Sequence, residues 1–189
     1  MNNFLDNIYG IIFSPRETFE KLFQNPSLIQ GFVIVAVVSI LGTLLNFECY
    51  RGGQCVFLLG FKTITSAIGG IISWLFFASF IELVASVFKQ SGKIKEFLCL
   101  SAFALVPWIF VAPVELLKTG GVPGGVFGIL IGLGIWIWVT VLIFMALIRT
   151  YNLSFGRTVI LLVMPFFAGF LAFNWITGFF VTMFNILKI

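Results

Sequence analysis

Residues 126–148 read VFGILIGLGIWIWVTVLIFMALI, a run without a single charged side chain. A helix needs about 20 consecutive apolar residues to cross the hydrocarbon core of a bilayer. This run therefore predicts a transmembrane helix, and four other long apolar stretches, two of them with a single glutamate each, predict the same. The expected spans cover about residues 29–47, 63–88, 97–117, 126–148 and 159–187. The predicted fold class is thus all-α, a polytopic integral membrane protein with five transmembrane helices.

The composition of the whole chain favours lipid over water as the medium around these runs. Of the 189 residues, 60% are hydrophobic and 10% are charged, whereas about a quarter of a soluble domain is charged. The net charge of +4 comes from basic residues scattered between apolar runs, so we do not expect nucleic-acid binding. Histidine, the commonest general base and metal ligand, is absent. We therefore expect no enzyme, no metal site and no cofactor.

The distribution of lysine and arginine predicts the orientation in the membrane. Cytoplasmic loops carry an excess of positive charge. Of the 11 basic residues, seven lie on the side of the N-terminus and four on the opposite side, since 7 + 4 = 11. The seven are Arg16, Lys21, Lys89, Lys93, Lys95, Arg149 and Arg157, and the four are Arg51, Lys62, Lys118 and Lys188. We therefore expect a cytoplasmic N-terminus and an exoplasmic C-terminus.

Two of the three cysteines lie between the first two expected spans. Cys49 and Cys55 then face the exoplasmic compartment, which is oxidising and permits disulfides. The sequence favours a disulfide between them, and the alternative is two free thiols near the end of a span. Cys99, at the start of the third span, is expected to be a packing residue.

The chain divides into two expected regions, a cytoplasmic N-terminal segment at residues 1–28 and a transmembrane domain at residues 29–189. The first is interrupted too often by polar residues to span a bilayer. Its apolar residues recur at roughly helical spacing, which is typical of a helix at the membrane surface. Two interpretations stay open: a surface that binds a cytoplasmic partner, or a collar that seats the first span.

A second short helix is predicted within this segment from a capping pattern. Ser14 can bond the free backbone N–H groups of a new helix, and Pro15 suits the first helical position. Arg16 follows, and Glu17 completes a capping box with Ser14.

Polar residues inside the expected spans form a candidate intramembrane site, because buried ionisable groups are costly in lipid and indicate function. Glu82 lies in the second span. Pro107, in the third, leaves a backbone carbonyl one turn earlier without its usual donor. We expect Glu82 to accept bonds from a neighbouring helix or, when protonated, to donate to that carbonyl. Asn174, in the fifth span, is expected to bond between helices.

Three glycines recur every four residues at the start of the fourth span. Gly124, Gly128 and Gly132 line one helical face, and missing side chains let two backbones approach closely. This pattern predicts helix packing, either within the chain or against a second copy.

Several motifs occur in an order that resembles a known family. Residues 14–22 read SPRETFEKL and are followed by Asn25-Pro26-Ser27, residues 102–108 read AFALVPW, and residues 151–157 read YNLSFGR. Together with Trp136 and Trp138 they resemble the Yip-one (Ypt-interacting protein) family. The resemblance implies five spans, a cytoplasmic N-terminus, an exoplasmic C-terminus and no catalytic residues.

Eukaryotic members of that family act in vesicle traffic, bind prenylated Rab GTPases and form membrane complexes with one another. They carry a longer cytoplasmic N-terminal region, whereas 28 residues precede the first expected span here. We therefore do not expect binding of Rab-type GTPases, and the short form resembles a prokaryotic member in a bacterial or archaeal cell membrane.

Two functions follow from the sequence. The first is a non-enzymatic protein that organises the membrane or recruits partners, through lipid contacts and assembly with itself or another membrane protein. The alternative is a small transporter or channel with Glu82 in the pathway.

Overall fold

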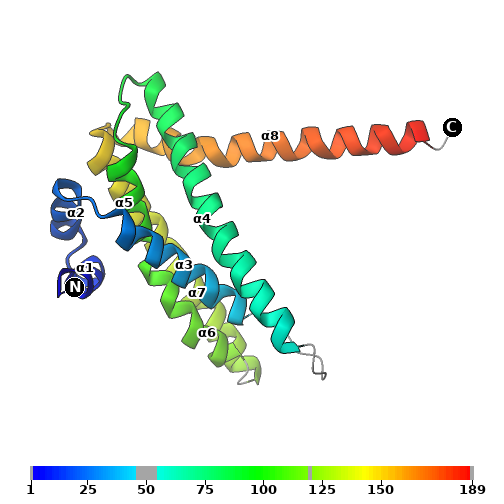
Figure 1. Ribbon diagram of the computed structural model, residues 1–189, viewed down its shortest axis with the longest axis horizontal. Coiled ribbons are helices and arrows are strands. Elements are labelled where there is room, and N and C mark those ends of the chain that lie inside the picture. Colours follow the sequence, from blue (N-terminus) through cyan, green and yellow to red (C-terminus); the bar gives the residue numbers. More distant parts are fainter. Residues whose placement is uncertain (1, 46–54, 119–120, 188–189) are drawn as a thin grey trace.

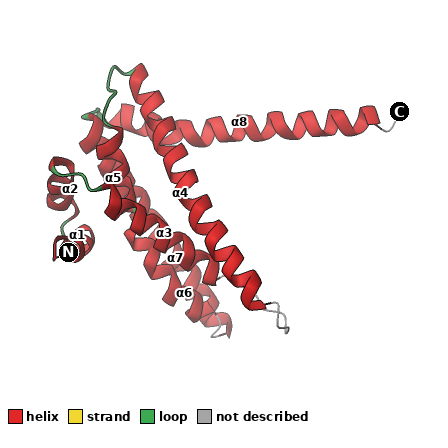
Figure 2. Ribbon diagram, viewed as in Figure 1, coloured by secondary structure: helices red, strands yellow, loops and turns green. Residues whose placement is uncertain are grey.

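The computed structural model describes residues 2–45, 55–118 and 121–187, with side chains described at 4–45, 57–115 and 125–184. Within these ranges the chain forms eight α-helices, one short 3-10 helix and no strand (Figures 1 and 2). Five helical segments are long and apolar enough to cross a membrane. The predicted all-α fold with five spans is therefore confirmed.

Four of the five spans are single helices, and three of these extend beyond the charge-free runs. Lys62, Arg149 and Arg157 lie inside helices rather than at their boundaries, because a long basic side chain can lie along a helix and keep its charge in the headgroup layer. The four spans are α3 (Leu28–Leu45), α4 (Cys55–Val87), α7 (Gly121–Tyr151) and α8 (Phe155–Leu187).

The third span is broken in the middle. It consists of α5 (Ile94–Ala104), the 3-10 helix η1 (Val106–Phe110) and α6 (Val111–Lys118). Pro107 lies in η1 and has no N–H to donate. Tighter bonds close the gap: the Leu105 amide donates to the Ala102 carbonyl at 3.1 Å, and the Trp108 amide donates to the Leu105 carbonyl at 2.9 Å. The helical bonding that Pro107 interrupts is thus replaced by a 3-10 turn.

Helix α5 lies at the centre of the bundle. Every residue from Phe97 to Ala104 is buried. Helices α3, α4 and α7 pack against α5, and Figure 1 shows them running side by side at steep angles to α8.

The N-terminal segment forms two helices, α1 (Asn2–Phe13) and α2 (Pro15–Gln24), that pack on the outside of α5, and α2 also packs on α7. Phe19 and Leu22 of α2 are buried and belong to one apolar cluster with Leu100 and Phe103 of α5. The apolar stripe of α2 is therefore covered by the bundle.

The side-chain bonds of the predicted capping box are not formed. Ser14 occupies the N-cap position and Pro15 the first turn, but the Ser14 hydroxyl makes no capping bond. The Ser14 amide already donates to the Gly10 carbonyl at 2.7 Å, so it is not free for the Glu17 carboxylate. Instead the Thr18 hydroxyl donates to the Ser14 carbonyl at 3.0 Å.

Helix α8 leaves the bundle. Figure 1 shows it, coloured orange to red, running away from the other helices. Its first turns contact α4 and α7, and Leu161 is fully buried there. Residues 169–184 are all exposed. The helix runs without interruption through Pro165 and Gly169.

Candidate functional site

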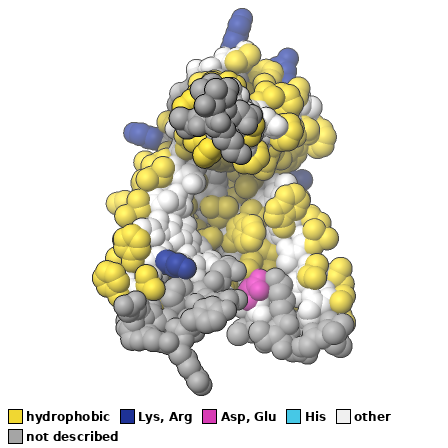
Figure 3. Space-filling view, turned by 90° about the vertical axis from the view of Figure 1, so that its right-hand side faces the viewer, with side chains coloured by type: hydrophobic (Ala, Val, Ile, Leu, Met, Phe, Trp, Pro, Cys, Tyr) yellow, Lys and Arg dark blue, Asp and Glu magenta, His cyan; other side chains and the backbone are white. Residues whose placement is uncertain are grey.

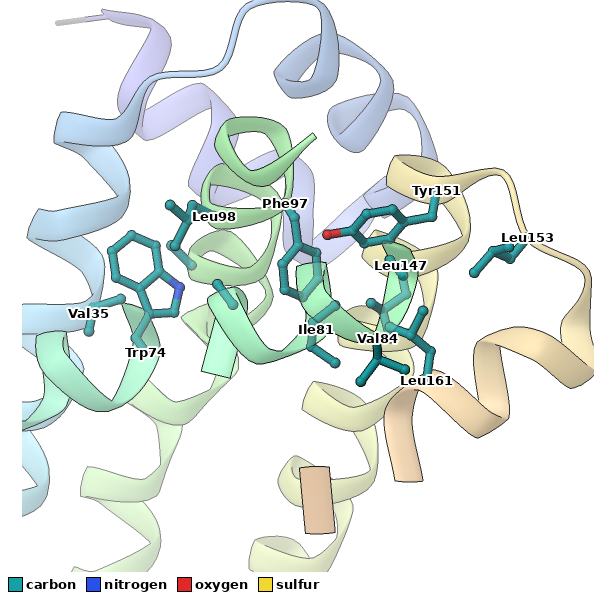
Figure 4. Close-up of a cluster of buried hydrophobic side chains, with 13 residues drawn as sticks. Val35, Trp74, Ile81, Val84, Phe97, Leu98, Leu147, Tyr151, Leu153 and Leu161 are labelled. Carbon is teal, nitrogen blue, oxygen red and sulfur yellow. The ribbon is translucent and has the colours of Figure 1, made fainter. Parts of the chain in front are cut away.

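A hydrogen-bonded clamp joins three spans at one end of the bundle. Glu82, half-buried near the end of α4, accepts a bond from the backbone N–H of Gly92 and another from that of Lys93 at 3.3 Å. Its second carboxylate oxygen accepts a bond from the Tyr151 hydroxyl at 2.6 Å. Tyr151 ends α7 and is fully buried, and Figure 4 shows its hydroxyl turned toward Phe97 of α5.

The clamp satisfies groups that would otherwise lack partners. Lys93 is the N-cap residue of α5 and makes no side-chain capping bond, so the Glu82 carboxylate supplies the acceptor that the helix end needs. A negative charge is also favourable at a helix N-terminus. The buried Tyr151 hydroxyl gains its partner in the same place. The chemistry of this site is therefore the joining of α4, α5 and α7.

The structure does not bring Glu82 to Pro107. The backbone around Pro107 is closed locally, because the Leu105 amide bonds the Ala102 and Phe103 carbonyls. The carboxylate of Glu82 bonds groups at the α4–α5 turn and at the end of α7 instead. The predicted polar site of Glu82, Pro107 and Asn174 is therefore not brought together. Glu82 instead takes part in the clamp at the end of the bundle.

Asn174 lies on the exposed part of α8. Its side-chain amide donates to the Phe170 carbonyl of the same helix at 2.8 Å. This bond is local, and the expected bond between helices is not found within the described residues.

A cavity of about 500 Å³ lies between α3, α4, α5, α7 and the start of α8. Figure 3 shows the molecule hollowed beneath α8, with hydrophobic side chains in the hollow. Its walls are mostly apolar and aromatic, and include Trp74, Phe77, Leu105, Trp108, Trp136 and Phe166.

Two polar side chains on the cavity wall are bonded within the protein. The Trp74 indole N–H donates to the Ser101 hydroxyl at 3.0 Å, and the Ser101 hydroxyl donates to the Leu98 carbonyl at 3.2 Å. These bonds join α4 to α5 in the core that Figure 4 shows. Because most of its lining side chains are apolar, the cavity suits apolar material.

Close helix approach occurs at two glycines outside the predicted repeat on α7. A side chain on Gly70 of α4 would overlap the Ser39 side chain of α3. A Cβ on Gly31 of α3 would lie 3.2 Å from the Cβ of Ala102 in α5. Neither glycine belongs to a repeat, so only the packed structure identifies them.

The three glycines of the predicted face on α7 have different surroundings. Gly128 is buried, whereas a Cβ on Gly132 would meet no atom within 4 Å. Gly124 lies in α7, but its surroundings are outside the described side chains.

The structure describes the three cysteines to different extents. Cys49, and with it the predicted disulfide to Cys55, lies outside the described residues. Cys99 is free and buried, with its sulfur 3.8 Å from the Ser27 carbonyl oxygen. Among the described residues, no three metal-binding side chains of His, Cys, Asp or Glu gather at one place.

Comparison with known proteins points to one family. A family model described as Yip1 domain matches residues 9–176. The chain is also 29% identical, over 126 residues, to a protein of Methanocaldococcus jannaschii described as uncharacterized; the alignment covers 59% of this chain and 87% of that protein. No solved structure matches.

Proposed function

Because the chain belongs to the Yip1 domain family of non-enzymatic membrane proteins, we propose that it organises the membrane or recruits membrane partners without catalysing a reaction. The bilayer is its medium, and assembly with itself or another membrane protein is its mode of action. The similarity to an archaeal protein supports a bacterial or archaeal cell membrane as its location. The excess of basic residues on one side supports a cytoplasmic N-terminus.

The exposed length of α8 is the observation that carries this proposal. The exposed part, residues 169–184, is about 24 Å long at 1.5 Å per residue, so it fits within the roughly 30 Å of a hydrocarbon core. It is apolar on every side and has no charged face, so it does not suit a position flat in the headgroup layer. Its exposed surface therefore belongs inside the membrane.

The side chains on that surface favour contact with protein. Helices in lipid associate through close packing rather than through the hydrophobic effect. Aromatic rings offer large, rigid contact areas and are enriched at protein interfaces. The exposed part of α8 carries Phe170, Phe173, Trp175, Phe179, Phe180 and Phe184.

The geometry gives no support to a transporter with Glu82 in its pathway. Glu82 is absent from the lining of the cavity beneath α8. Its carboxylate is engaged by the α4–α5 turn and by Tyr151.

The test is photo-crosslinking of the full-length protein in native membranes. A benzophenone amino acid replaces Phe173 on α8 in one sample, and Phe103 in the buried core in the other. We expect position 173 to crosslink to a second copy or to another membrane protein, and position 103 to crosslink only within the chain. Lipid adducts alone at position 173, together with a monomeric mass in lipid discs, would overturn the proposal.

A further inference from the structure

A second cavity, of about 350 Å³, lies between α2 and α7. Its lining combines two guanidinium groups, one carboxylate and three apolar side chains: Arg16, Arg149, Glu20, Phe19, Met145 and Ile148. Arg149 lies in the last turn of α7, so the cavity is at the end of the bundle where the span leaves the hydrocarbon core.

The charges in this cavity are unbalanced toward the positive. Arg149 forms an ion pair with Glu20 and its guanidinium lies over the ring of Phe23, 4.6 Å from the centroid. The Nε of Arg149 is buried without a hydrogen-bond partner in the described structure. Arg16 is exposed and has no bond or ion pair with the described residues. Two cations and one anion leave a net charge of +1, with unused N–H donors.

The apolar half of the cavity lies deeper along the same helix. Met145 and Ile148 precede Arg149 by four residues and one residue, and residues three and four apart share a helical face. The ligand that fits is therefore amphipathic, with an anionic group at the arginines and an apolar part toward the membrane centre. Guanidinium groups bind phosphate oxygens in a bidentate fork.

We propose that this cavity binds the phosphate of an anionic lipid headgroup, held between Arg16 and Arg149, with the adjoining part of the acyl chains on Met145 and Ile148. Basic pockets beside membrane spans are well suited to such headgroups. The bound lipid would bridge α2 and α7, so the seating of the N-terminal helices on the bundle depends on the charge of the surrounding lipid. The lining of this cavity does not include α8. The lipid-binding proposal and the proposed function can therefore be refuted separately by their own experiments.

The first experiment counts lipids retained by the full-length protein. The protein is reconstituted in discs of phosphatidylcholine with phosphatidylglycerol, and the retained phosphatidylglycerol is measured by native mass spectrometry. Arg16→Gln is expected to bind phosphatidylglycerol about fivefold more weakly, because one basic residue near the surface contributes about 1 kcal/mol. Arg157→Gln is the matched control, since Arg157 is exposed at the start of α8 outside the cavity. Equal retention by wild type and Arg16→Gln, or an equal loss in Arg157→Gln, would overturn the proposal.

The second experiment changes the charge in the opposite direction. Arg149 is not substituted, because its ion pair with Glu20 also holds α2 on α7. Glu20 is substituted instead, since its side chain is half-exposed. Glu20→Gln removes the only carboxylate of the cavity and is expected to raise phosphatidylglycerol retention severalfold. A purely structural ion pair would instead give unchanged or lower retention, and that result would contradict the proposal.

A third measurement separates a lipid phosphate from a free anion. Inorganic phosphate is added at millimolar concentration to the wild-type protein with bound phosphatidylglycerol. We expect the lipid to stay bound, because the free ion gains nothing from Met145 and Ile148. Full displacement by inorganic phosphate would show that the cavity is a free-anion site.

Discussion

The third and fifth spans have the same hydropathy but opposite surroundings. The most apolar stretch of each has a mean hydropathy of 2.2, yet 61% of that stretch is buried in the third span and 6% in the fifth. Hydropathy therefore identifies a span without telling whether protein or lipid surrounds it. In a bilayer both environments are apolar, so packing geometry decides between them.

The two helices differ in what packs against them: α5 lies between α3, α4 and α7, whereas α8 packs on parts of α4 and α7 among the described residues. Buried α5 alternates large rings with small residues such as Cys99, Ser101, Ala102 and Ala104, and small residues allow neighbouring backbones to approach. The exposed part of α8 also has small residues among its rings, namely Gly169, Ala172 and Gly178, yet all three are exposed. Four predictions test whether burial, rather than composition, decides what each helix tolerates.

The largest effect is expected from removing a phenyl ring. Phe103 of α5 is fully buried, whereas Phe173 of α8 is 66% exposed. Phe103→Ala leaves a cavity that the bundle cannot fill and is expected to cost about 3 kcal/mol. Phe173→Ala is expected to cost nothing measurable in the folding of the single chain, because the ring lies on its exposed surface. Reversible unfolding in mixed micelles measures both, and equal losses would contradict the comparison.

Adding a side chain at a glycine extends the comparison to close packing. Gly31 lies against Ala102 of α5, whereas a Cβ on Gly169 of α8 would meet no atom within 4 Å. Gly31→Leu is expected to separate α3 from α5 and to cost about 2 kcal/mol. Gly169→Leu removes a poor helix former and leaves stability unchanged or slightly higher. The same unfolding measurement decides, and a tolerated Gly31→Leu would show that α3 and α5 are not closely packed.

Much of the fold follows from the sequence, and its limits are physical. Long apolar runs identify the five spans because a bilayer imposes a minimum length, and Pro107 marks a position where the helical hydrogen bonding is incomplete. The exposure of α8 is not encoded in hydropathy, because lipid and protein interior are equally apolar to it.

The clamp shows the same limit at the level of single residues. Glu82 stood out because a carboxylate inside an apolar run is costly. Its partner Tyr151 is separated from it by 69 positions, and a tyrosine at the end of an apolar run is common. The pairing therefore depends on how α4 and α7 meet, which no local pattern specifies. The side-chain bonds of the capping box are also absent for a reason outside the local pattern, because the Ser14 amide already donates to the Gly10 carbonyl.

The third prediction compares the polar groups of the two regions. Glu82 bonds two other helices, whereas Asn174 of α8 bonds only its own. Glu82→Gln keeps an acceptor oxygen but loses the charge, and is expected to cost about 1 kcal/mol, the difference between charged and neutral hydrogen bonds. Asn174→Leu is expected to leave the unfolding free energy unchanged. A Glu82→Gln variant as stable as wild type would show that the clamp needs no charge.

The smallest effect is expected from a single indole N–H. Trp74→Phe keeps an aromatic ring against α5 but removes the donor to the Ser101 hydroxyl. Hydrogen bonds between helices in membranes contribute about 0.6 kcal/mol on average, and this is the expected loss. Trp175→Phe in α8, where the indole is 74% exposed, is the matched control and is expected to change nothing. A double-mutant cycle with Ser101→Ala isolates the bond: a coupling energy near zero would mean that Trp74 stabilises α5 through its ring alone, and the contrast between the buried and exposed spans would then depend on packing without any polar contribution.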